Sequence, residues 1–289
     1  MMENKIIDAI KKRYSSRTFS NRTIPKETIG YIQDFLGRPL KAPFGSETSF
    51  KLVPTRMTGI KDAEKIGTYG FTKGAMYFIA GKVKKSANCF EDFGFVFEKI
   101  ILKMTELGLG TCWLGGTFKR KDFYKILDCR EDELIPAVTP LGYSNEKKGF
   151  RDVVMRSLAG SDKRMAWEEL FFREGKPLGK KEAGEFKQAL EMVRIAPSSS
   201  NNQPWRISMD KDLFHFYIKS SGSGKKDSLR DKLKRMDIGI AMYHFDASVN
   251  TRGLKGEWQM DDNYKIPGLR YISSWKRRGY DQQKEGRKV

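Results

Sequence analysis

Basic and hydroxyl side chains alternate near the N-terminus. Arg13, Ser15 and Arg17 stand at every second position of AIKKRYSSRTF, where a predicted helix gives way to extended chain. Alternation along extended chain points all three side chains to one side. Two guanidinium groups and a hydroxyl there suit phosphate or another anion, because arginine offers a fixed fork of donors. The same residues also fit a basic helix C-terminus that offsets the helix dipole, and both readings stay open.

Two further segments offer polar or bare backbone groups to a ligand. In APSSSNNQPW, Ser198, Ser199 and Asn201 carry short donors and acceptors, which suit the edge of a planar heterocycle. A plain polar loop bounded by prolines would also have this composition. In GLGTCWLGG, Gly115 and Gly116 let the backbone approach a ligand without an intervening side chain.

Spacing argues against several common chemistries. GLGTCWLGG departs from the dinucleotide-binding pattern GxGxxG, since Trp113 takes the place of the third glycine, and SGSGKKDS is no P-loop. No GxSxG is present, and the two histidines fit neither a zinc site nor a catalytic triad. We expect no metal and no side-chain nucleophile. His215, inside a predicted strand, is expected to be packed or solvated, and Cys112 to be a small buried side chain.

The chain contains an internal repeat at a separation of 145 residues. The segment that starts at Asp92 aligns without gaps with the one that starts at Asp237, and both predict a helix of about five turns that ends at a glycine. The other matched pairs are Gly94 with Gly239, Gly108 with Gly253, Leu109 with Leu254 and Trp113 with Trp258. Upstream, Ala42-Pro43 falls against Ala196-Pro197. We therefore predict two half-domains of similar plan, 1–160 and 161–289, the second with a basic C-terminal tail.

Short apolar runs predict the strands. They are GAMYFIAG, ELIPAVTPLGY, WRISMD, LFHFYIK and LRYISSW. WRISMD and LFHFYIK should form a hairpin that turns at Asp210-Lys211.

The net charge of +19 is compatible with nucleic acid, an anionic membrane or phosphate-bearing small molecules. Most of the lysines and arginines are scattered over predicted helix surfaces, which favours a solvated surface over a nucleic-acid stripe. No run of 18 apolar residues and no secretory leader is evident, so we expect a cytoplasmic protein without membrane contact.

Together, the three ligand-type segments resemble the nitroreductase flavoprotein family, and their order resembles its fused single-chain subgroup. The resemblance implies an α+β fold in which two fused half-domains, each with a mostly antiparallel sheet flanked by helices, form a pseudo-dimer. It implies FMN as cofactor and NADH or NADPH as electron donor. The family's ring-contacting asparagine has no counterpart that we can assign between Lys65 and Gly74.

The resemblance also assigns roles to residues of this chain. The RxSxR-type segment would bind the FMN phosphate and pyrimidine edge, the glycine turn would lie by the flavin ring, and the PSSxN segment would arrive from the other half. A basic pair would complete the phosphate site. The implied cofactor-binding residues are Arg13, Ser15, Arg17, Gly115, Gly116, Lys148, Arg151, Pro197, Ser198, Ser199 and Asn201.

The implied activity is ping-pong hydride transfer through FMN N5 to a quinone, nitroaromatic or related acceptor, with no catalytic side chain required. Because the fusion supplies the partner loop within one chain, a monomer should suffice. Two alternatives stay open: a flavin-fold protein without redox turnover that serves as a binding or scaffold module, and a basic nucleic-acid-binding protein. The sequence leaves the physiological acceptor and the choice between NADH and NADPH undecided.

Overall fold

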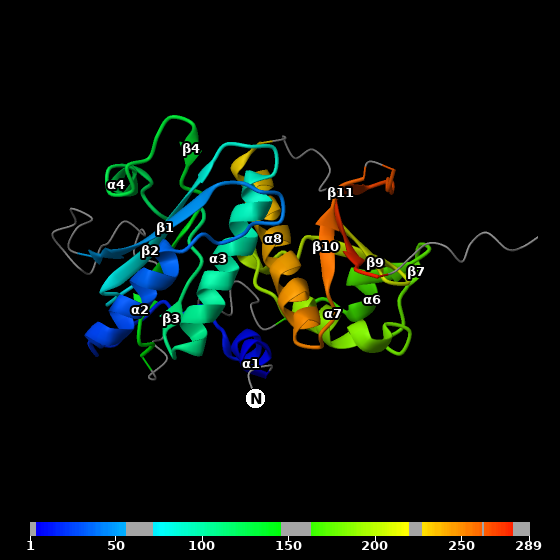
Figure 1. Ribbon diagram of the computed structural model, residues 1–289, viewed down its shortest axis with the longest axis horizontal. Coiled ribbons are helices and arrows are strands. Elements are labelled where there is room, and N and C mark those ends of the chain that lie inside the picture. Colours follow the sequence, from blue (N-terminus) through cyan, green and yellow to red (C-terminus); the bar gives the residue numbers. More distant parts are fainter. Residues whose placement is uncertain (1–3, 56–71, 146–162, 220–226, 262, 280–289) are drawn as a thin grey trace, which may run out of the picture.

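The computed structural model describes residues 4–55, 72–145, 163–219, 227–261 and 263–279. Among the described residues, two sheets lie on opposite sides of the molecule, with long helices between them (Figure 1). This is the α+β, pseudo-dimeric arrangement expected from the sequence. The predicted boundary near residue 160 falls in 146–162, outside the described residues.

The first sheet is antiparallel throughout. Its strands run in the order β1 (Thr48–Pro54), β2 (Tyr77–Lys84), β5 (Val138–Gly142) and β3 (Gly110–Thr111), and β4 (Glu133–Leu134) pairs with β2. The predicted apolar run GAMYFIAG covers only the first part of β2, which continues to Lys84, and the single run ELIPAVTPLGY contains both β4 and β5.

The second sheet is antiparallel except for one short pair. Its order is β10 (Gly256–Gln259), β11 (Leu269–Arg277), β9 (Leu213–Lys219), β8 (Trp205–Asp210), β6 (Phe171–Arg173) and β7 (Lys176–Pro177), with β6 and β8 parallel. The predicted hairpin is β8–β9. Its turn lies one residue later than expected, because Asp210 pairs with Leu213 and the φ of Lys211 is +52°.

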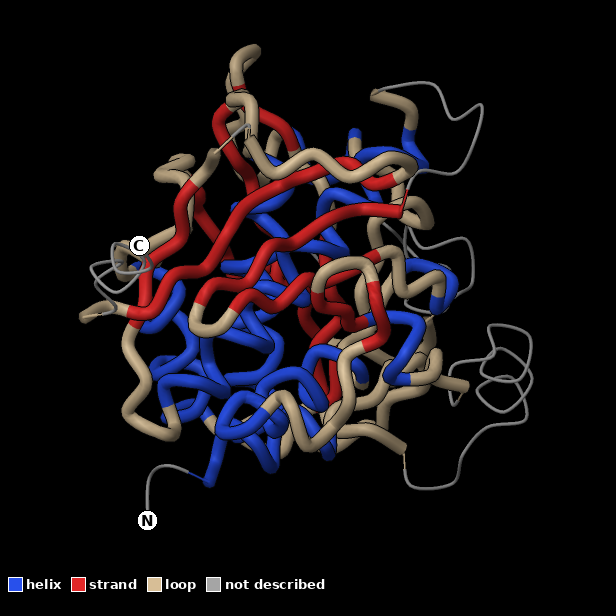
Figure 2. Tube along the Cα trace, turned by 90° about the vertical axis from the view of Figure 1, so that its right-hand side faces the viewer, coloured by secondary structure: helices blue, strands red, loops and turns tan. Residues whose placement is uncertain are grey.

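Two central helices join the halves, α3 (Cys89–Glu106) and α8 (Leu229–Asn250). Around them lie α1 (Asn4–Lys12), α2 (Lys26–Gly37), the short α4 (Lys121–Tyr124) and α6 (Trp167–Leu170), and α7 (Lys187–Arg194). Figure 2 shows strands of one sheet crossing in front of these helices. The main hydrophobic core draws residues from both sheets and both central helices, so the two halves share one interior.

A smaller core covers the other face of the first sheet. Phe78 and Val138 of the sheet pack there against Phe118 and Phe123, which come from the segment after β3. This segment therefore covers one face of the sheet.

The central helices cross at two glycines. A Cβ atom on Gly94 would overlap the carbonyl oxygen of Met236, and one on Gly239 would overlap that of Glu91. Only residues without a side chain allow the two backbones to approach this closely. The aligned glycines of the internal repeat therefore lie where its two copies pack backbone against backbone.

Other aligned pairs also play equivalent parts. Gly108 and Gly253 follow the two long helices in the left-handed conformation, with φ of +74° and +71°. Asp92 and Asp237 each accept hydrogen bonds from backbone N–H groups of the loop that precedes the first long strand of their own half. Leu109 and Leu254, which follow the two helix ends, are both buried. The repeat seen in the sequence is thus a repeat of structural roles.

A buried ion pair also links the central helices. Arg235 donates through Nε and Nη2 to the two carboxylate oxygens of Glu91, both at 2.6 Å, and its guanidinium lies over the ring of Phe90. Burial raises the pKa of Glu91, and the bonds from Arg235 oppose that rise. Glu91 depends on this partner for its charge, because its side chain is only 2% exposed.

We expect Arg235→Met to destabilise the protein by about 3–5 kcal/mol, because it leaves the Glu91 carboxylate buried without a partner. The matched control is Arg194→Met, which removes the more exposed pair with Glu191 and should cost less than about 1 kcal/mol. Urea unfolding of the two variants measures the difference. Equal losses would show that the Glu91 pair contributes no more than a surface pair.

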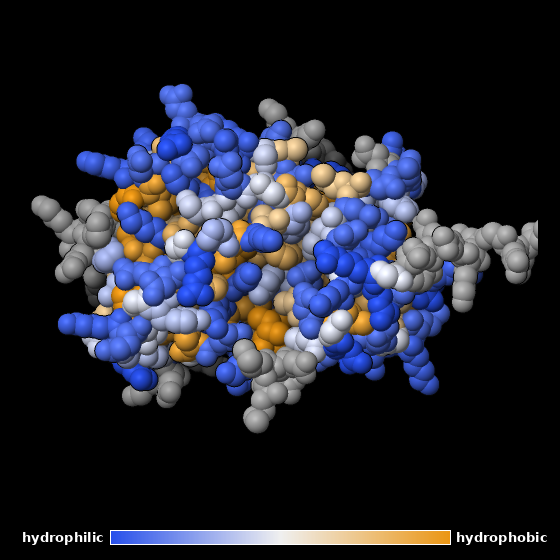
Figure 3. Space-filling model, viewed as in Figure 1, coloured by the Kyte–Doolittle hydropathy of each residue, from blue (hydrophilic) through white to orange (hydrophobic). Residues whose placement is uncertain are grey.

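Hydrophilic residues cover most of the face seen in Figure 3, and apolar residues are visible between them. No helix among the described residues has both the length and the apolar composition needed to span a bilayer.

Candidate functional site

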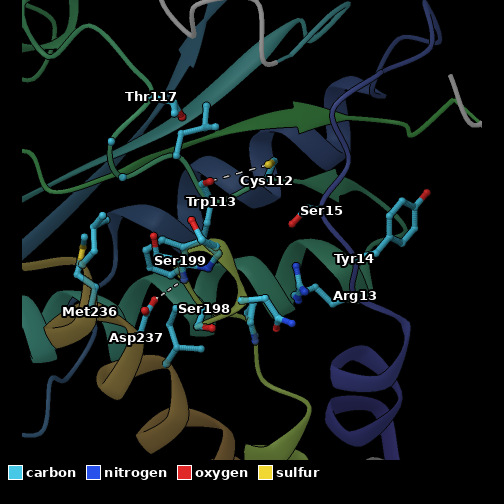
Figure 4. A pocket seen from close by; sticks show the side chains of 18 of the residues that line it. Arg13, Tyr14, Ser15, Cys112, Trp113, Thr117, Ser198, Ser199, Met236 and Asp237 are labelled. Carbon is cyan, nitrogen blue, oxygen red and sulfur yellow. Dashed lines mark hydrogen bonds between the residues drawn. The ribbon is translucent and has the colours of Figure 1, made fainter. Parts of the chain in front are cut away.

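A pocket of about 460 Å³ lies where the two halves meet, within the range of about 300–1,000 Å³ typical of ligand sites (Figure 4). Five segments line it: the chain after α1, the glycine turn after β3, Arg164 just before α6, the polar loop after α7 and one face of α8. Segments from both ends of the sequence therefore build one cavity.

Nine of the eleven residues predicted from the sequence line this pocket. They are Arg13, Ser15, Arg17, Gly115, Gly116, Pro197, Ser198, Ser199 and Asn201. Lys148 and Arg151 lie outside the described residues, as does most of the segment that should contain the ring-contacting asparagine.

Alternation after α1 sorts the side chains only in part, because Tyr14 lines the pocket although it has the same parity as Ser16. Ser16 is buried and its hydroxyl lies 2.6 Å from that of Ser144, and neither residue lines the pocket. Arg13, Ser15 and Arg17, the residues of the other parity, line the pocket. Extended backbone is maintained here because Ser15 bridges to β3.

The position of Arg17 favours an anion-binding role over a role in offsetting the dipole of α1. It lies five residues beyond Lys12, where α1 ends, so it is out of range of the terminal carbonyls. Its Nη1 atom is buried and has no hydrogen-bond partner among the described residues. A buried guanidinium donor without an acceptor is costly, and an anionic or carbonyl oxygen in the pocket would satisfy it.

The glycine turn is packed against α8. A Cβ on Gly115 would lie 2.6 Å from Cδ2 of Leu233, whereas one on Gly116 would meet only ordinary contact with Leu229. The carbonyl of Gly115 accepts a 2.6 Å bond from Arg120. The sequence attributes both glycines to a ligand's approach, and in the structure Gly115 also packs against the side chain of Leu233.

The polar loop after α7 adopts strained backbone. Ser200, Asn201 and Gln203 all have positive φ, between +44° and +53°. Such conformations persist in residues other than glycine only where surrounding contacts impose them. Here the backbone N–H of Gln203 donates to the hydroxyl of Ser198, and the backbone N–H of Ser199 donates to Asp237.

Two side chains of the loop form hydrogen bonds with other parts of the protein. Asn201 accepts a 2.5 Å bond from Arg164 and donates to the carbonyl of Lys163. Gln203 accepts from the backbone N–H of Met165. Asn201 thus lines the pocket with its amide already engaged, and it fixes the shape of the loop.

A family model described as Putative TM nitroreductase matches residues 5–249. The chain belongs to this nitroreductase family. The resemblance stated from the three motifs is thereby confirmed. No curated protein sequence matches the chain.

Similarity to a solved structure extends over most of the chain. A putative nitroreductase from Thermotoga maritima is 18% identical, with a TM-score of 0.60, and the match covers 93% of this chain and 92% of that one. A nitroreductase with bound FMN from Desulfitobacterium hafniense is 20% identical over 50% of this chain and 92% of that one, with a TM-score of 0.40. One from Bacteroides fragilis, also with bound FMN, is 20% identical over 50% and 90%, with a TM-score of 0.37.

Several residues that line the pocket of this nitroreductase-family chain escaped the sequence interpretation. They are Tyr14, Cys112, Trp113, Leu114, Thr117, Arg164, Ser200, Leu233, Met236, Asp237 and Ile240. The α8 residues share one helix face, but their spacing looks like that of ordinary core residues. The alignment of Asp237 with Asp92 is the one signal that could have singled it out.

A buried polar network holds the indole ring of Trp113 in place. Its Nε1 donates to Glu98 Oε2 at 2.7 Å, and Glu98 Oε1 lies 3.0 Å from His244 Nε2. His244 Nδ1 lies 2.9 Å from the carbonyl of Met192, which can only accept, so Nδ1 carries a proton. A further proton must lie between His244 and Glu98. The network fixes the pocket-lining indole on the nitroreductase core.

His215 and the pocket-lining Cys112 are both buried. Burial lowers the pKa of His215 to about 4, and its Nδ1 lies 2.7 Å from the hydroxyl of Ser274. Cys112 is buried beside β5, where its backbone N–H donates to Thr139. His215 is packed within the strand and Cys112 is buried, as expected for both.

Proposed function

We propose that the chain is an FMN-dependent oxidoreductase that takes electrons from NADH or NADPH and passes them to a quinone, nitroaromatic or related small molecule. One observation carries the proposal: nine residues chosen from sequence motifs, which are up to 188 positions apart (Arg13 to Asn201), line a single pocket. Membership of the nitroreductase family supports it.

The residues present fit FMN. Arg13 and Arg17 would hold an anionic or carbonyl oxygen, and the unpartnered Nη1 of Arg17 supplies a donor for it. Ser198 would face the ring edge with its hydroxyl, which accepts one bond from Gln203 and still has a proton to donate. When bound, FMN would supply the hydride-carrying ring atom, N5.

The protein's own part is to bind, orient and shield. Leu233, Met236 and Ile240 give the pocket an apolar wall against which a planar ring can pack. Donor and acceptor would use this one cavity in turn, which gives ping-pong kinetics. Both halves contribute within one chain, so we propose that a monomer suffices. We also propose that 1–160 and 161–289 are the two half-domains and that the enzyme acts in the cytoplasm.

We predict one FMN per chain, because the complementary set of residues is present only once. In the second half, Met260 and Asp261, just after β10, align with the two glycines, and Trp167 is a core residue where a second basic RxSxR segment would be needed. Glu168 and Glu169 beside it would repel a phosphate.

The measurement is flavin released by heat, per mole of reconstituted protein. A yellow protein with one equivalent is expected, and size-exclusion chromatography with light scattering should show activity in the monomer fraction. Two equivalents would reject the single-site argument. A colourless protein that takes up no FMN would reject the proposed function in favour of a module without cofactor.

A further inference from the structure

Asp237 is the one acidic side chain in the wall that α8 contributes to the pocket. The other lining residues of this helix, Leu233, Met236 and Ile240, are apolar. Asp237 itself is 4% exposed. A carboxyl group in such surroundings must be matched by donors or must stay neutral.

The donors around Asp237 are too few for a carboxylate. Oδ1 accepts a 2.9 Å bond from the backbone N–H of Ser199, and Oδ2 is buried without a hydrogen-bond partner among the described residues. Its counterpart in the first half, Asp92, accepts two backbone bonds of 2.8 Å, from Phe44 and Ser46, one on each oxygen. The second copy has kept the loop anchor and left one oxygen without a donor.

The charges nearby do not replace the missing donor. Lys234 lies on the same helix, Arg13, Arg17 and Arg164 line the same pocket, and across the helix crossing Glu91 is paired with Arg235. Burial outweighs these charges and raises the pKa of Asp237 to about 8, opposed by the bond from Ser199 and by Lys234. At neutral pH the group is therefore a carboxylic acid, and its proton belongs on Oδ2, because Oδ1 already accepts.

We propose that Asp237 is a ligand-binding residue that donates a hydrogen bond from Oδ2 to a carbonyl oxygen or ring nitrogen of the planar molecule in the pocket. The inference rests on the proposed function. Two sources could present such an atom to the apolar wall: the flavin ring, or the quinone that follows it. FMN and 1,4-naphthoquinone are the two probes that distinguish them.

The decisive variant is Asp237→Asn. An asparagine can accept from Ser199 through its oxygen and donate from its nitrogen at the place of Oδ2, so it imitates the protonated acid at every pH. FMN is titrated into the cofactor-free protein by fluorescence, and naphthoquinone into the oxidised FMN-loaded protein by flavin absorbance, between pH 6.5 and 9.5.

For the ligand that Asp237 contacts, the dissociation constant of the wild type should rise above about pH 8 toward tenfold per pH unit, since only the protonated form binds. Asp237→Asn should bind as the wild type does at pH 6.5 and should lose this rise. Changes that belong to the ligand's own titration appear in both proteins and cancel. Parallel profiles for both ligands would overturn the proposal, as would failure of both ligands to bind.

A second measurement needs no ligand and separates the two proposals. Between about pH 4 and 8 the folded protein holds a proton that the unfolded chain has released, so stability should fall as pH rises. The folding equilibrium constant of Asp237→Asn relative to wild type should then increase by up to tenfold per pH unit over this window. A flat ratio would show that Asp237 is ionised and would overturn the inference even if FMN binds.

Asp92→Asn is the matched control. Its amide nitrogen would face one of two backbone N–H donors, so this variant should be less stable than the wild type at pH 8 and above, where Asp237→Asn should be at least as stable. Equal behaviour of the two variants would show that Asp237 has the same anchoring role as Asp92 and no proton to donate. If FMN fails to bind although the folding ratio changes as expected, the proposed function fails and the ionisation state stands.

Discussion

We expect Gly239→Ala to destabilise the protein by about 3 kcal/mol or more, at the upper end of the cost of overpacking a core. The added methyl group would overlap the backbone carbonyl of Glu91 on the opposite helix, and a backbone group cannot rotate away as a side chain can. Relief would require α3 and α8 to separate, which would open the core that both halves share. Urea unfolding, followed by circular dichroism, measures the loss.

Gly30→Ala is the matched control for this prediction. Gly30 lies in α2, and a Cβ there would meet nothing within 4 Å. Because alanine is the better helix former, this variant should gain about 0.5–1 kcal/mol. Gly94→Ala should behave like Gly239→Ala, since its added Cβ would overlap the carbonyl of Met236. A Gly239→Ala protein as stable as the wild type would show that the helices can part at little cost.

Arg17→Ala should weaken FMN binding by about 1.5–3 kcal/mol, or roughly one to two decades in the dissociation constant, as expected for a charge-assisted hydrogen bond. The stability of the cofactor-free protein should hardly change, because Nη1 of Arg17 has no partner to lose among the described residues. Fluorescence titration of FMN gives the affinity, and thermal unfolding without FMN gives the stability. Arg13→Ala should act in the same direction.

Arg22→Ala provides the comparison, since Arg22 is exposed and its guanidinium lies over the ring of Tyr143, outside the pocket. This variant should bind FMN as the wild type does. If Arg17→Ala retained wild-type affinity, Arg17 would be a structural residue, and the anion-binding role inferred from its alternation with Arg13 would be lost.

The repeat can be recognised from the sequence because the residues that are identical in its two copies include glycines whose replacement would require the backbone to move. Gly94 and Gly239 form the helix crossing, and Gly108 and Gly253 adopt positive φ after the helices. Each requirement falls on a single residue, so it leaves a trace in the alignment even where the rest of the two halves has diverged. The same holds for the hairpin β8–β9, whose alternation and turn residues are adjacent in the chain.

Alternation likewise identified Arg13, Ser15 and Arg17, and a polar, proline-bounded composition identified the loop from Pro197 to Asn201. A resemblance to one family supplied what these patterns could not, namely the cofactor that such segments would share. Each of these features depends on residues within one short stretch.

Only the tertiary structure decided how the segments meet. Leu233, Met236 and Asp237 have the spacing of a core-facing helix, and nothing local marks them as pocket residues. Gly115 packs against Leu233 as well as lining the pocket, and Asn201 accepts a hydrogen bond from Arg164, a residue that no motif singled out. The state of Asp237 depends on one missing backbone donor, seen only by comparison with Asp92. Such contacts depend on the packing of α8 against α3, because burial and the number of available donors are properties of the folded neighbourhood rather than of the residue.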